Sequence, residues 1–184
     1  AGYATAHYGK WHLANNMIPD SPTPAEYGYD DYGAYTCSGE QMPVHEDALH
    51  AAEFIRQSHD AGKPWFINLW LHEAHTPFHT QPKYRWWFRD LEDETDNIYA
   101  ATLAHADFRI GQLLDLLDEL EIAGNTLVIF SSDNGPARGS KGAELALMHD
   151  TATGAGYNIA AAKGITSGRK GYKASLLEGG INVP

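Results

Sequence analysis

The sequence contains a single cysteine, Cys37, among its 184 residues. One thiol excludes an internal disulfide and any zinc site built from several cysteines. It does not identify a cellular compartment, because a lone thiol is compatible with oxidising and reducing surroundings. Free cysteine is usually buried and unreactive, so we expect Cys37 to be a structural residue.

Basic residues are also scarce. The chain has 13 Lys and Arg against 24 Asp and Glu, which gives a formal net charge of -11. Proteins that bind nucleic acid mainly through phosphate contacts need the opposite sign of charge. The composition therefore predicts no nucleic-acid partner.

Long hydrophobic runs are absent. No apolar stretch approaches the roughly 20 residues of a membrane-spanning helix, and the N-terminal residues lack the charged and apolar regions of a signal peptide. With 184 residues and 43% hydrophobic content, the chain can bury the core of one domain. We therefore expect one domain, or part of one, with no membrane span.

Two segments have helical patterns. Residues 43–64 begin with Pro43 at a favourable first helical position, carry acids in the early turns and end at Gly62 and Pro64. Apolar residues recur at intervals of three and four between Asn97 and Ile122, which is typical of an amphipathic helix.

Two short apolar runs predict buried strands. "WFINLWL" at 65–71 and "LVIF" at 127–130 have almost no polar interruption, as expected for strands covered on both faces. A strand, a long helix and a second strand suggest a right-handed crossover in a parallel sheet, which predicts α/β architecture. In such sheets ligands bind beyond the carboxyl ends of the strands.

Polar residues follow both predicted strands. Asp133 and Asn134 lie in "SSDNGP", where a turn is the simplest interpretation because Asp, Asn, Gly and Pro all favour turns. The alternative is a site for a hard cation, since carboxylate and amide oxygens suit calcium or magnesium better than zinc. Calcium takes about six to eight oxygen ligands, so the remaining ligands would have to come from elsewhere.

Other candidate residues carry cations or titratable groups. His75 follows the first strand in "HEAHTP", and loops on a rigid scaffold often hold catalytic groups. If residues 1–16 include a strand, Lys10 and His12 share one face and Trp11 points to the other. Lysine suits a phosphate or sulfate oxygen, and histidine can transfer protons. Lys173 precedes a pair of glycines, 179–180, whose backbone can adopt conformations that other residues avoid. Each of these is also compatible with an ordinary surface or loop residue.

Four segments together resemble signatures of the sulfatases of the alkaline phosphatase superfamily, in the family's order. "GYATAHYGKWHL" is similar to GYxTxxxGKWHLG, with Ala14 where the final glycine is common, and "HEAHTP" is similar to APHTP, with Ala74 for proline. Residues 99–135 resemble the family's long helix, strand and DNG element. "KASLLEGGINVP" resembles KGxxxEGGIRVP, with Ala174 for glycine and Asn182 for arginine.

The resemblance implies an alkaline-phosphatase-like α/β sandwich with a mostly parallel sheet between helices, incomplete in this chain. It implies hydrolysis of a sulfate ester, of a small molecule or a glycan, with one Ca²⁺ ion and a formylglycine nucleophile. Asp133 and Asn134 would be calcium ligands. Lys10 and His12 would contact the nucleophile and the sulfate, and His75 and Lys173 would bind sulfate oxygens. Family habit also implies a periplasmic, secreted or lysosomal protein.

The family's nucleophile arises from the cysteine of a CxPSR motif that precedes the GKWHL segment, and a pair of aspartates lies earlier still. Cys37 does not match, because "CSGEQ" has Gly39 and Gln41 where the motif has proline and arginine and lies after Lys10. We therefore expect residues 1–184 to be one partial catalytic domain, an internal fragment that lacks the nucleophile segment and the C-terminal part. A chain without nucleophile and half its metal ligands is expected to be inactive.

Two other functions stay open at this point. A phosphatase or phosphonate monoester hydrolase would share the fold, and a degenerate relative would bind a sulfated glycan without cleaving it. A further alternative concerns "YRWWFRD", in which Trp86 and Trp87, flanked by Arg85 and Arg89, could stack on sugar rings and hold an anionic group. Helix packing is the more common role of such an aromatic run.

Overall fold

The computed structural model describes residues 2–13, 20–35, 42–138, 143–151 and 154–184. They form two compact units. Unit 1 comprises residues 1–74 and 106–124, and unit 2 comprises residues 75–105 and 125–184. Cys37 lies outside the described residues. Among the helices of the described residues, none has the length and hydrophobicity needed to cross a membrane.

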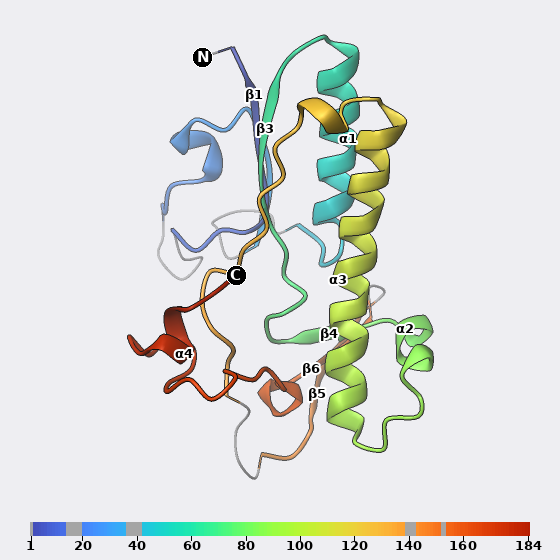
Figure 1. Cartoon of the computed structure of the whole chain (residues 1–184), viewed down its shortest axis with the longest axis vertical. Helices are drawn as coiled ribbons and strands as arrows, with labels where there is room; N and C mark the ends of the chain where they lie inside the picture. The colour runs from blue at the N-terminus through green and yellow to red at the C-terminus, as the bar shows by residue number, and fades with distance from the viewer. Residues whose placement is uncertain (1, 14–19, 36–41, 139–142, 152–153) are drawn as a thin grey trace. The chain divides into compact units, whose positions relative to one another are not determined.

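Unit 1 is built on a parallel three-stranded sheet (Figure 1). Its strands are β1 (Ala4–Lys10), β2 (Asp31–Tyr35) and β3 (Trp65–Trp70), in the order β2-β1-β3. His7 of β1 lies in register with Tyr32 of β2 and Asn68 of β3. The prediction of α/β architecture with a parallel sheet is confirmed.

Strand β3 forms as predicted, but the expectation that both of its faces are buried is wrong. Phe66 is 51% exposed, and the other residues of the strand are only partly buried. The reason is that alternate side chains of a strand point to opposite faces of the sheet. Trp65, Ile67 and Leu69 pack against the core of unit 1, whereas Phe66 points to the other face and is exposed there.

Two helices contribute to unit 1. Helix α1 (Asp47–Asp60) begins four residues after Pro43, the predicted first residue of the helix. His45 has a left-handed backbone conformation, with φ 73°, that a right-handed helix cannot include. Helix α3 (Glu94–Glu119) confirms the second helical pattern. Its second half packs beside α1 through Leu116 and Leu117, which contact Ile55 (Figure 1).

The core of unit 1 lies between the sheet and α1. Its buried members come from β1, β2, α1 and the segment before α1, and they are Ala6, Tyr8, Tyr35, Met42, Ala51 and Phe54. A short 3-10 helix, η1 (Pro24–Tyr27), precedes β2 and is closed by a capping box between Thr23 and Glu26. A second, η2 (Ala123–Asn125), follows α3.

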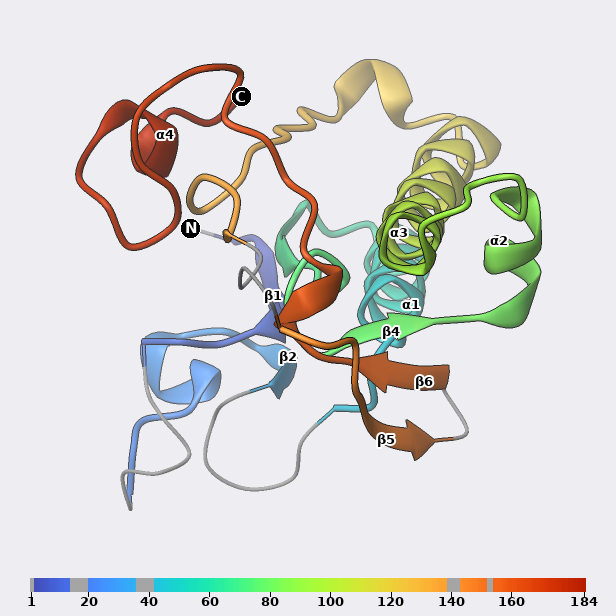
Figure 2. The same cartoon turned by 90° about the horizontal axis from the view of Figure 1, so that it is seen from below.

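Unit 2 contains a small antiparallel sheet (Figure 2). The strands β4 (Phe78–Thr80), β6 (Gly154–Tyr157) and β5 (Leu147–Thr151) lie in the order β4-β6-β5. Helix α2 (Pro82–Trp87), the first half of α3, the 3-10 helix η3 (Ile159–Ala161) and α4 (Glu178–Ile181) complete the unit. Phe78, Ile98 and Ala161 are fully buried in its core.

The prediction of a buried strand at residues 127–130 is wrong. The segment lies outside both sheets, and its four side chains are between 55% and 84% exposed. A strand exists only when a neighbour accepts and donates its backbone hydrogen bonds, and the two sheets of the described residues provide no such neighbour for this run.

A buried acidic group, Asp47, lies at the start of α1. Its side chain is completely buried, and its Oδ1 accepts a hydrogen bond from the backbone N–H of Ala48 at 2.9 Å. Nearby, the buried His45 and Glu73 are paired, with 3.1 Å between Nδ1 and Oε1. Burial and, secondly, the charge of Glu73 raise the pKa of Asp47 from 3.8 to about 7.

This shift predicts a pH-dependent stability. The folded state holds the Asp47 proton more tightly than the unfolded state, so its stabilising contribution is complete below pH 3.8 and is lost as the pH rises to about 7. At pH 8, Asp47→Asn should therefore have a free energy of unfolding roughly 2 kcal/mol higher than the unchanged protein, measured by denaturant unfolding. This difference should vanish near pH 4. Asp60→Asn, at the exposed end of the same helix, is the control. If the free energy of unfolding depended on pH in the same way for all three proteins, the prediction would be contradicted.

Candidate active site

Unit 2 brings two of the sequence signatures together. The loop that carries Asp133 and Asn134 is bonded to the C-terminal segment, since the N–H of Gly135 donates to the Gly180 carbonyl at 2.8 Å and that of Lys173 donates to the Pro136 carbonyl at 2.9 Å. The Ser131 hydroxyl also donates to the Pro184 carbonyl at 3.0 Å. The two predicted metal ligands and the predicted sulfate-binding lysine therefore belong to one hydrogen-bonded element.

Glycines make this close approach possible. A Cβ atom at Gly135 would overlap the Gly179 carbonyl oxygen, and one at Gly179 would overlap the Gly171 carbonyl oxygen. At Gly180 the obstacle would be the Ser175 carbonyl. Neither residue of the pair 179–180 has a positive φ, so the pair does not use the left-handed conformation that glycine permits. What the pair provides is room for neighbouring backbone.

The donor atoms of the loop suit a hard cation. The Asp133 side chain is exposed, and Asn134 is half-buried. The Asn134 amide N–H donates to the Gly135 carbonyl at 2.8 Å, which leaves its side-chain carbonyl as the atom suited to ligation. A carboxylate and an amide oxygen on adjacent residues match the oxygen ligands of calcium or magnesium.

The segment around Lys173 contains a strained residue. Ala174 has a φ of 71°, in the left-handed region that favours glycine. This is the position at which the sulfatase signature has glycine and the present sequence has alanine. The backbone geometry thus accounts for the glycine of the signature.

Ala174→Gly should therefore stabilise the protein. Relief of the left-handed strain outweighs the larger conformational freedom of glycine in the unfolded chain, so we expect a gain of roughly 0.5–1 kcal/mol. Denaturant unfolding measures it. Ala100→Gly, inside α3, should have the opposite sign, and a loss of stability at both positions would contradict the interpretation.

The same segment borders an open hollow lined by Ser167, Gly168, Arg169, Lys170, Leu177 and Glu178. Two of these side chains are cationic and one is anionic. The N–H of Gly179 donates to the Lys170 carbonyl at 2.7 Å, which fixes one wall of the hollow to α4. An anionic group would find a net positive lining there.

Lys10 and His12 belong to unit 1. Lys10 is the last residue of β1, and His12 follows the strand with an exposed side chain, whereas Trp11 is buried and donates its indole N–H to the Pro22 carbonyl at 3.2 Å. The alternation agrees with the expectation that Trp11 points away from the other two. Gly9, within β1, has a φ of 103°, and a Cβ atom there would overlap the Trp70 carbonyl oxygen of β3.

His7, which no sequence motif singles out, is hydrogen-bonded to the backbone of the predicted site residue Lys10. Its Nε2 donates to the Lys10 carbonyl at 3.0 Å and its Nδ1 accepts from the Asn68 amide at 3.1 Å. Burial lowers its pKa to about 4, so the ring is neutral at pH 7 and holds the backbone before Trp11. A histidine three residues before Lys10 in a buried strand was the only available signal.

His75 lies in unit 2, in the loop between β3 and β4, and is half-buried. Its Nδ1 donates to the Thr76 carbonyl at 2.7 Å, which orients the ring. The structure thus brings Lys173, Asp133 and Asn134 together, orients His75 within its own loop, and has Lys10 and His12 in the other unit.

Comparison with solved structures defines the class of fold. The chain superposes on Ps i-CgsB in complex with k-i-k-neocarrahexaose with a TM-score of 0.75 and 21% identity, over 100% of this chain and 44% of that one. It superposes on the PsFucS1 sulfatase from Pseudoalteromonas sp. with a TM-score of 0.67 and 22% identity, over 100% and 42% of the two chains. The architecture is the alkaline-phosphatase-like α/β fold, present here in part.

The family follows from the sequence. A model of the Sulfatase family matches residues 1–184, so the chain belongs to the sulfatase family, whose members are sulfuric ester hydrolases and generally use a divalent metal. It is 25% identical to N-acetylgalactosamine-6-sulfatase of Sus scrofa over 172 residues, covering 74% of this chain and 31% of that protein. It is 28% identical to steryl-sulfatase of Homo sapiens over 151 residues, covering 78% and 22%. The chain thus spans about a third or less of the curated relatives it matches.

Proposed function

We propose that the full-length protein hydrolyses a sulfate ester of a carbohydrate, with one Ca²⁺ ion and a formylglycine nucleophile. Residues 1–184 would form part of its single catalytic domain. The observation that carries the proposal is the pair of hydrogen bonds that join the Asp133 loop to the Lys173 segment, within a chain of the sulfatase family. Relatives named as carbohydrate sulfatases, and a structural neighbour bound to a carrageenan oligosaccharide, support the substrate class.

In this proposal Asp133 and Asn134 hold the calcium ion. When bound, the ion supplies positive charge that polarises the sulfuryl oxygens. Because calcium takes about six to eight oxygen ligands, the remaining ligands and the residue that becomes formylglycine belong to other parts of the full-length protein. The isolated 184-residue chain is therefore expected to lack activity.

The other site residues act on the sulfate group. Lys173 and His75 bind sulfuryl oxygens, and Lys10 and His12 contact the nucleophile and the sulfate. Displacement at sulfur builds negative charge on the leaving oxygen, so fixed cations and hydrogen-bond donors lower the barrier. A protonated histidine can deliver the proton that the leaving oxygen requires, and becomes neutral as it does so.

The direct test is release of inorganic sulfate by the full-length protein. An aryl sulfate and a sulfated galactosamine should both be hydrolysed in the presence of calcium, and matched phosphate esters should react at least about a hundredfold more slowly. Ion chromatography of the products measures both reactions. A protein that releases phosphate faster than sulfate, or neither with calcium present, would refute the proposal.

Substitution of Lys173 tests its role separately. Lys173→Gln removes the charge and retains much of the chain length, so we expect kcat on an aryl sulfate to fall about 10²- to 10³-fold with a smaller change in KM. Lys63→Gln, an exposed lysine of unit 1, is the matched control. Unchanged kcat in Lys173→Gln would exclude the residue from the reaction.

A further inference from the structure

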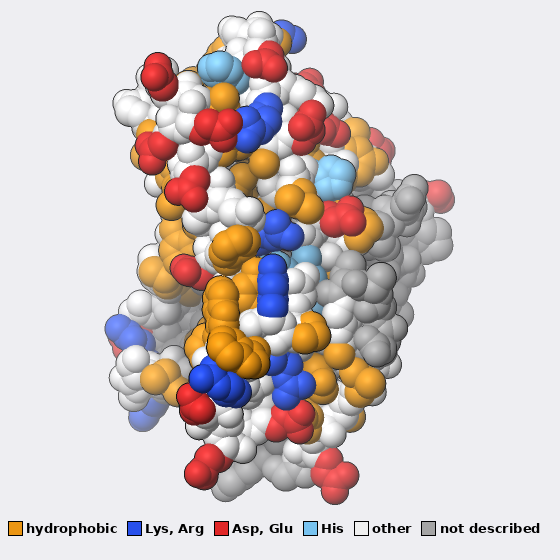
Figure 3. Space-filling view, turned by 90° about the vertical axis from the view of Figure 1, so that its right-hand side faces the viewer, with side chains coloured by type: hydrophobic (Ala, Val, Ile, Leu, Met, Phe, Trp, Pro, Cys, Tyr) orange, Lys and Arg blue, Asp and Glu red, His pale blue; other side chains and the backbone are white. Residues whose placement is uncertain are grey.

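Two adjacent tryptophans on α2 are exposed. Trp86 is 62% exposed and Trp87 is 53% exposed, although burying such side chains is among the largest apolar gains available to a fold. Figure 3 shows the face on which α2 lies, where hydrophobic side chains gather with Lys and Arg between them. Within the described residues, more than half of each indole side chain is therefore open to solvent. The packing residue of the aromatic run is Tyr84, which is buried and stacks on His105 at 4.7 Å.

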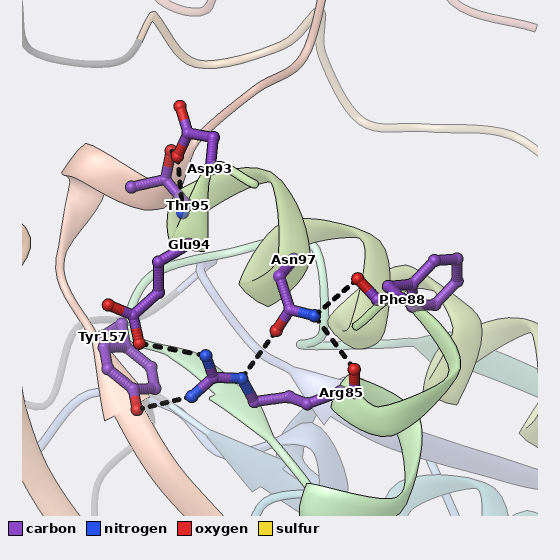
Figure 4. Close-up of polar contacts among 7 residues, drawn as sticks. All are labelled: Arg85, Phe88, Asp93, Glu94, Thr95, Asn97 and Tyr157. Carbon is purple, nitrogen blue, oxygen red and sulfur yellow. Dashed lines mark hydrogen bonds and ion pairs between the residues drawn. The ribbon is translucent and has the colours of Figure 1, made fainter. Parts of the chain in front are cut away.

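Hydrogen bonds and an ion pair of Arg85 hold α2, the helix that carries the tryptophans, against α3 and β6 (Figure 4). The Nε of Arg85 donates to the Asn97 side-chain carbonyl at 2.7 Å, and its two terminal nitrogens donate to Tyr157 and Glu94 at 3.2 and 3.0 Å. The Asn97 amide donates back to the carbonyls of Arg85 and Phe88, both at 2.9 Å. Arg85 therefore braces α2 within the unit, and these contacts make it less suited than Arg89 to hold a ligand anion.

Arg89 has a different environment. Its guanidinium carbon lies 4.1 Å from the centre of the Trp86 ring, and its Nη1 donates to the Trp86 carbonyl at 3.1 Å. The cation is thus held over one face of the indole, on the exposed side of the unit. Trp87 is held by an edge-to-face contact with Tyr84 at 5.1 Å. Both indoles are presented in fixed orientations, which reduces the entropy lost on binding.

Three of the five acidic residues between α2 and Asn97 are paired with cations, whereas Asp90 and Glu92 are exposed. Lys163 lies 2.9 Å from Asp93 and 3.1 Å from Asp96, and Glu94 pairs with Arg85 at 3.0 Å. Lys83 lies on α2 itself and adds a cation to that of Arg89. Its Nζ is 4.6 Å from the centre of the Tyr84 ring. In a chain of net charge -11, this local combination of cations and exposed indoles is complementary to an anionic ligand with apolar faces.

We propose that Lys83, Trp86, Trp87 and Arg89, here called the α2 surface, bind a sulfated oligosaccharide chain. Pyranose rings have apolar C–H faces that stack on indoles, and sulfate groups accept charge-assisted hydrogen bonds from Arg and Lys. The inference rests on the proposed sulfatase function and names a polymeric substrate for it. The α2 surface holds part of the chain that does not react, so it contributes to the affinity for polymer and leaves the chemical step unchanged.

The test measures saccharide binding by the full-length protein with isothermal titration calorimetry. The probes are a sulfated galactan hexasaccharide, its desulfated counterpart and inorganic sulfate. The double variant Trp86→Ala/Trp87→Ala should bind the sulfated hexasaccharide about tenfold more weakly, and Arg89→Gln should weaken it severalfold. Hydrolysis of a small aryl sulfate, the melting temperature and the affinity for inorganic sulfate should not change. Trp86→Phe/Trp87→Phe should retain most of the binding, and Phe66→Ala, an exposed aromatic of unit 1, should retain all of it.

Four results would overturn the inference. Unchanged hexasaccharide binding in the double alanine variant would exclude the indoles, and equal affinity for the desulfated probe would exclude the cations. Equal losses on aryl sulfate and hexasaccharide would assign the tryptophans to folding, and self-association through this surface without saccharide binding would assign it to a protein interface. Binding is measured independently of turnover, so a protein that cleaves no sulfate ester but binds the hexasaccharide through the α2 surface would refute the catalytic proposal alone.

Discussion

Asp133→Asn is expected to lower kcat/KM of the full-length protein for an aryl sulfate about 10²- to 10³-fold and to weaken calcium binding. The substitution keeps the size of the side chain and removes its negative charge. Asparagine offers one weak oxygen donor where a carboxylate offers two strong ones, and hard cations depend on carboxylate charge for affinity. Because the bound ion stabilises charge on the sulfuryl oxygens, weaker calcium binding reduces the rate. Steady-state kinetics at several calcium concentrations measure the effect.

High calcium should restore part of the activity of Asp133→Asn, and removal of calcium with a chelator should inactivate the unchanged protein reversibly. Asp115→Asn, at an exposed position of α3, is the matched control for loss of one negative charge. If Asp133→Asn and Asp115→Asn had the same activity at every calcium concentration, Asp133 would not be a metal ligand, and the turn interpretation of "SSDNGP" would hold.

The elements predicted from sequence are those whose pattern is local. Helices α1 and α3 and strand β3 were found because apolar spacing and helix-ending residues are properties of consecutive residues. The antiparallel strand β6 was missed because "GAGY" has no alternation of polar and apolar side chains and is stabilised by pairing with β4 and β5. Residues 127–130 show the converse, because a strong apolar run forms no strand when neither sheet among the described residues provides it with a partner.

The candidate site shows the same division. Asp133, Asn134 and Lys173 were identified because their residue types suit cation and sulfate binding and because their segments resemble sulfatase signatures. Their association depends on backbone hydrogen bonds that join Pro136 to Lys173 and Gly135 to Gly180, and no local pattern encodes contacts between residues so far apart in the sequence. His7 was missed for a related reason. It donates a hydrogen bond to the Lys10 carbonyl, but the sequence does not distinguish a strand histidine that makes such a bond from one that only packs.

The α2 run "YRWWFRD" illustrates how tertiary contacts divide apparently equivalent residues. Arg85 and Arg89 both flank the tryptophans, yet one braces α2 against Asn97, Tyr157 and Glu94 and the other covers an exposed indole. Which arginine faces inward is decided by the partners that α3 and β6 supply. Sequence spacing alone assigned the same role to both.

Gly135→Ala should disrupt the site without touching any proposed ligand. Gly135 is buried, and its missing Cβ leaves the space taken by the Gly179 carbonyl oxygen. An added methyl group must push the Asp133 loop and the C-terminal segment apart, because the nearest atoms belong to the backbone of Gly179 and Gly180 and cannot rotate away. The hydrogen bonds from Gly135 to Gly180 and from Lys173 to Pro136 would then lengthen or break. We expect a loss of about 1–3 kcal/mol in the free energy of unfolding.

The effect on catalysis should be larger than the effect on stability. Displacing a catalytic group by about 1 Å can cost roughly 10²-fold in rate, so kcat/KM should fall by about that factor at temperatures where the variant remains folded. Hydrogen exchange should show faster exchange of the Gly135 and Lys173 amides. Gly111→Ala is the matched control, because a Cβ there has no neighbour within 4 Å and alanine favours the helix by roughly 0.5–1 kcal/mol. Full activity and unchanged exchange in Gly135→Ala would mean that contact between these two segments does not maintain the site.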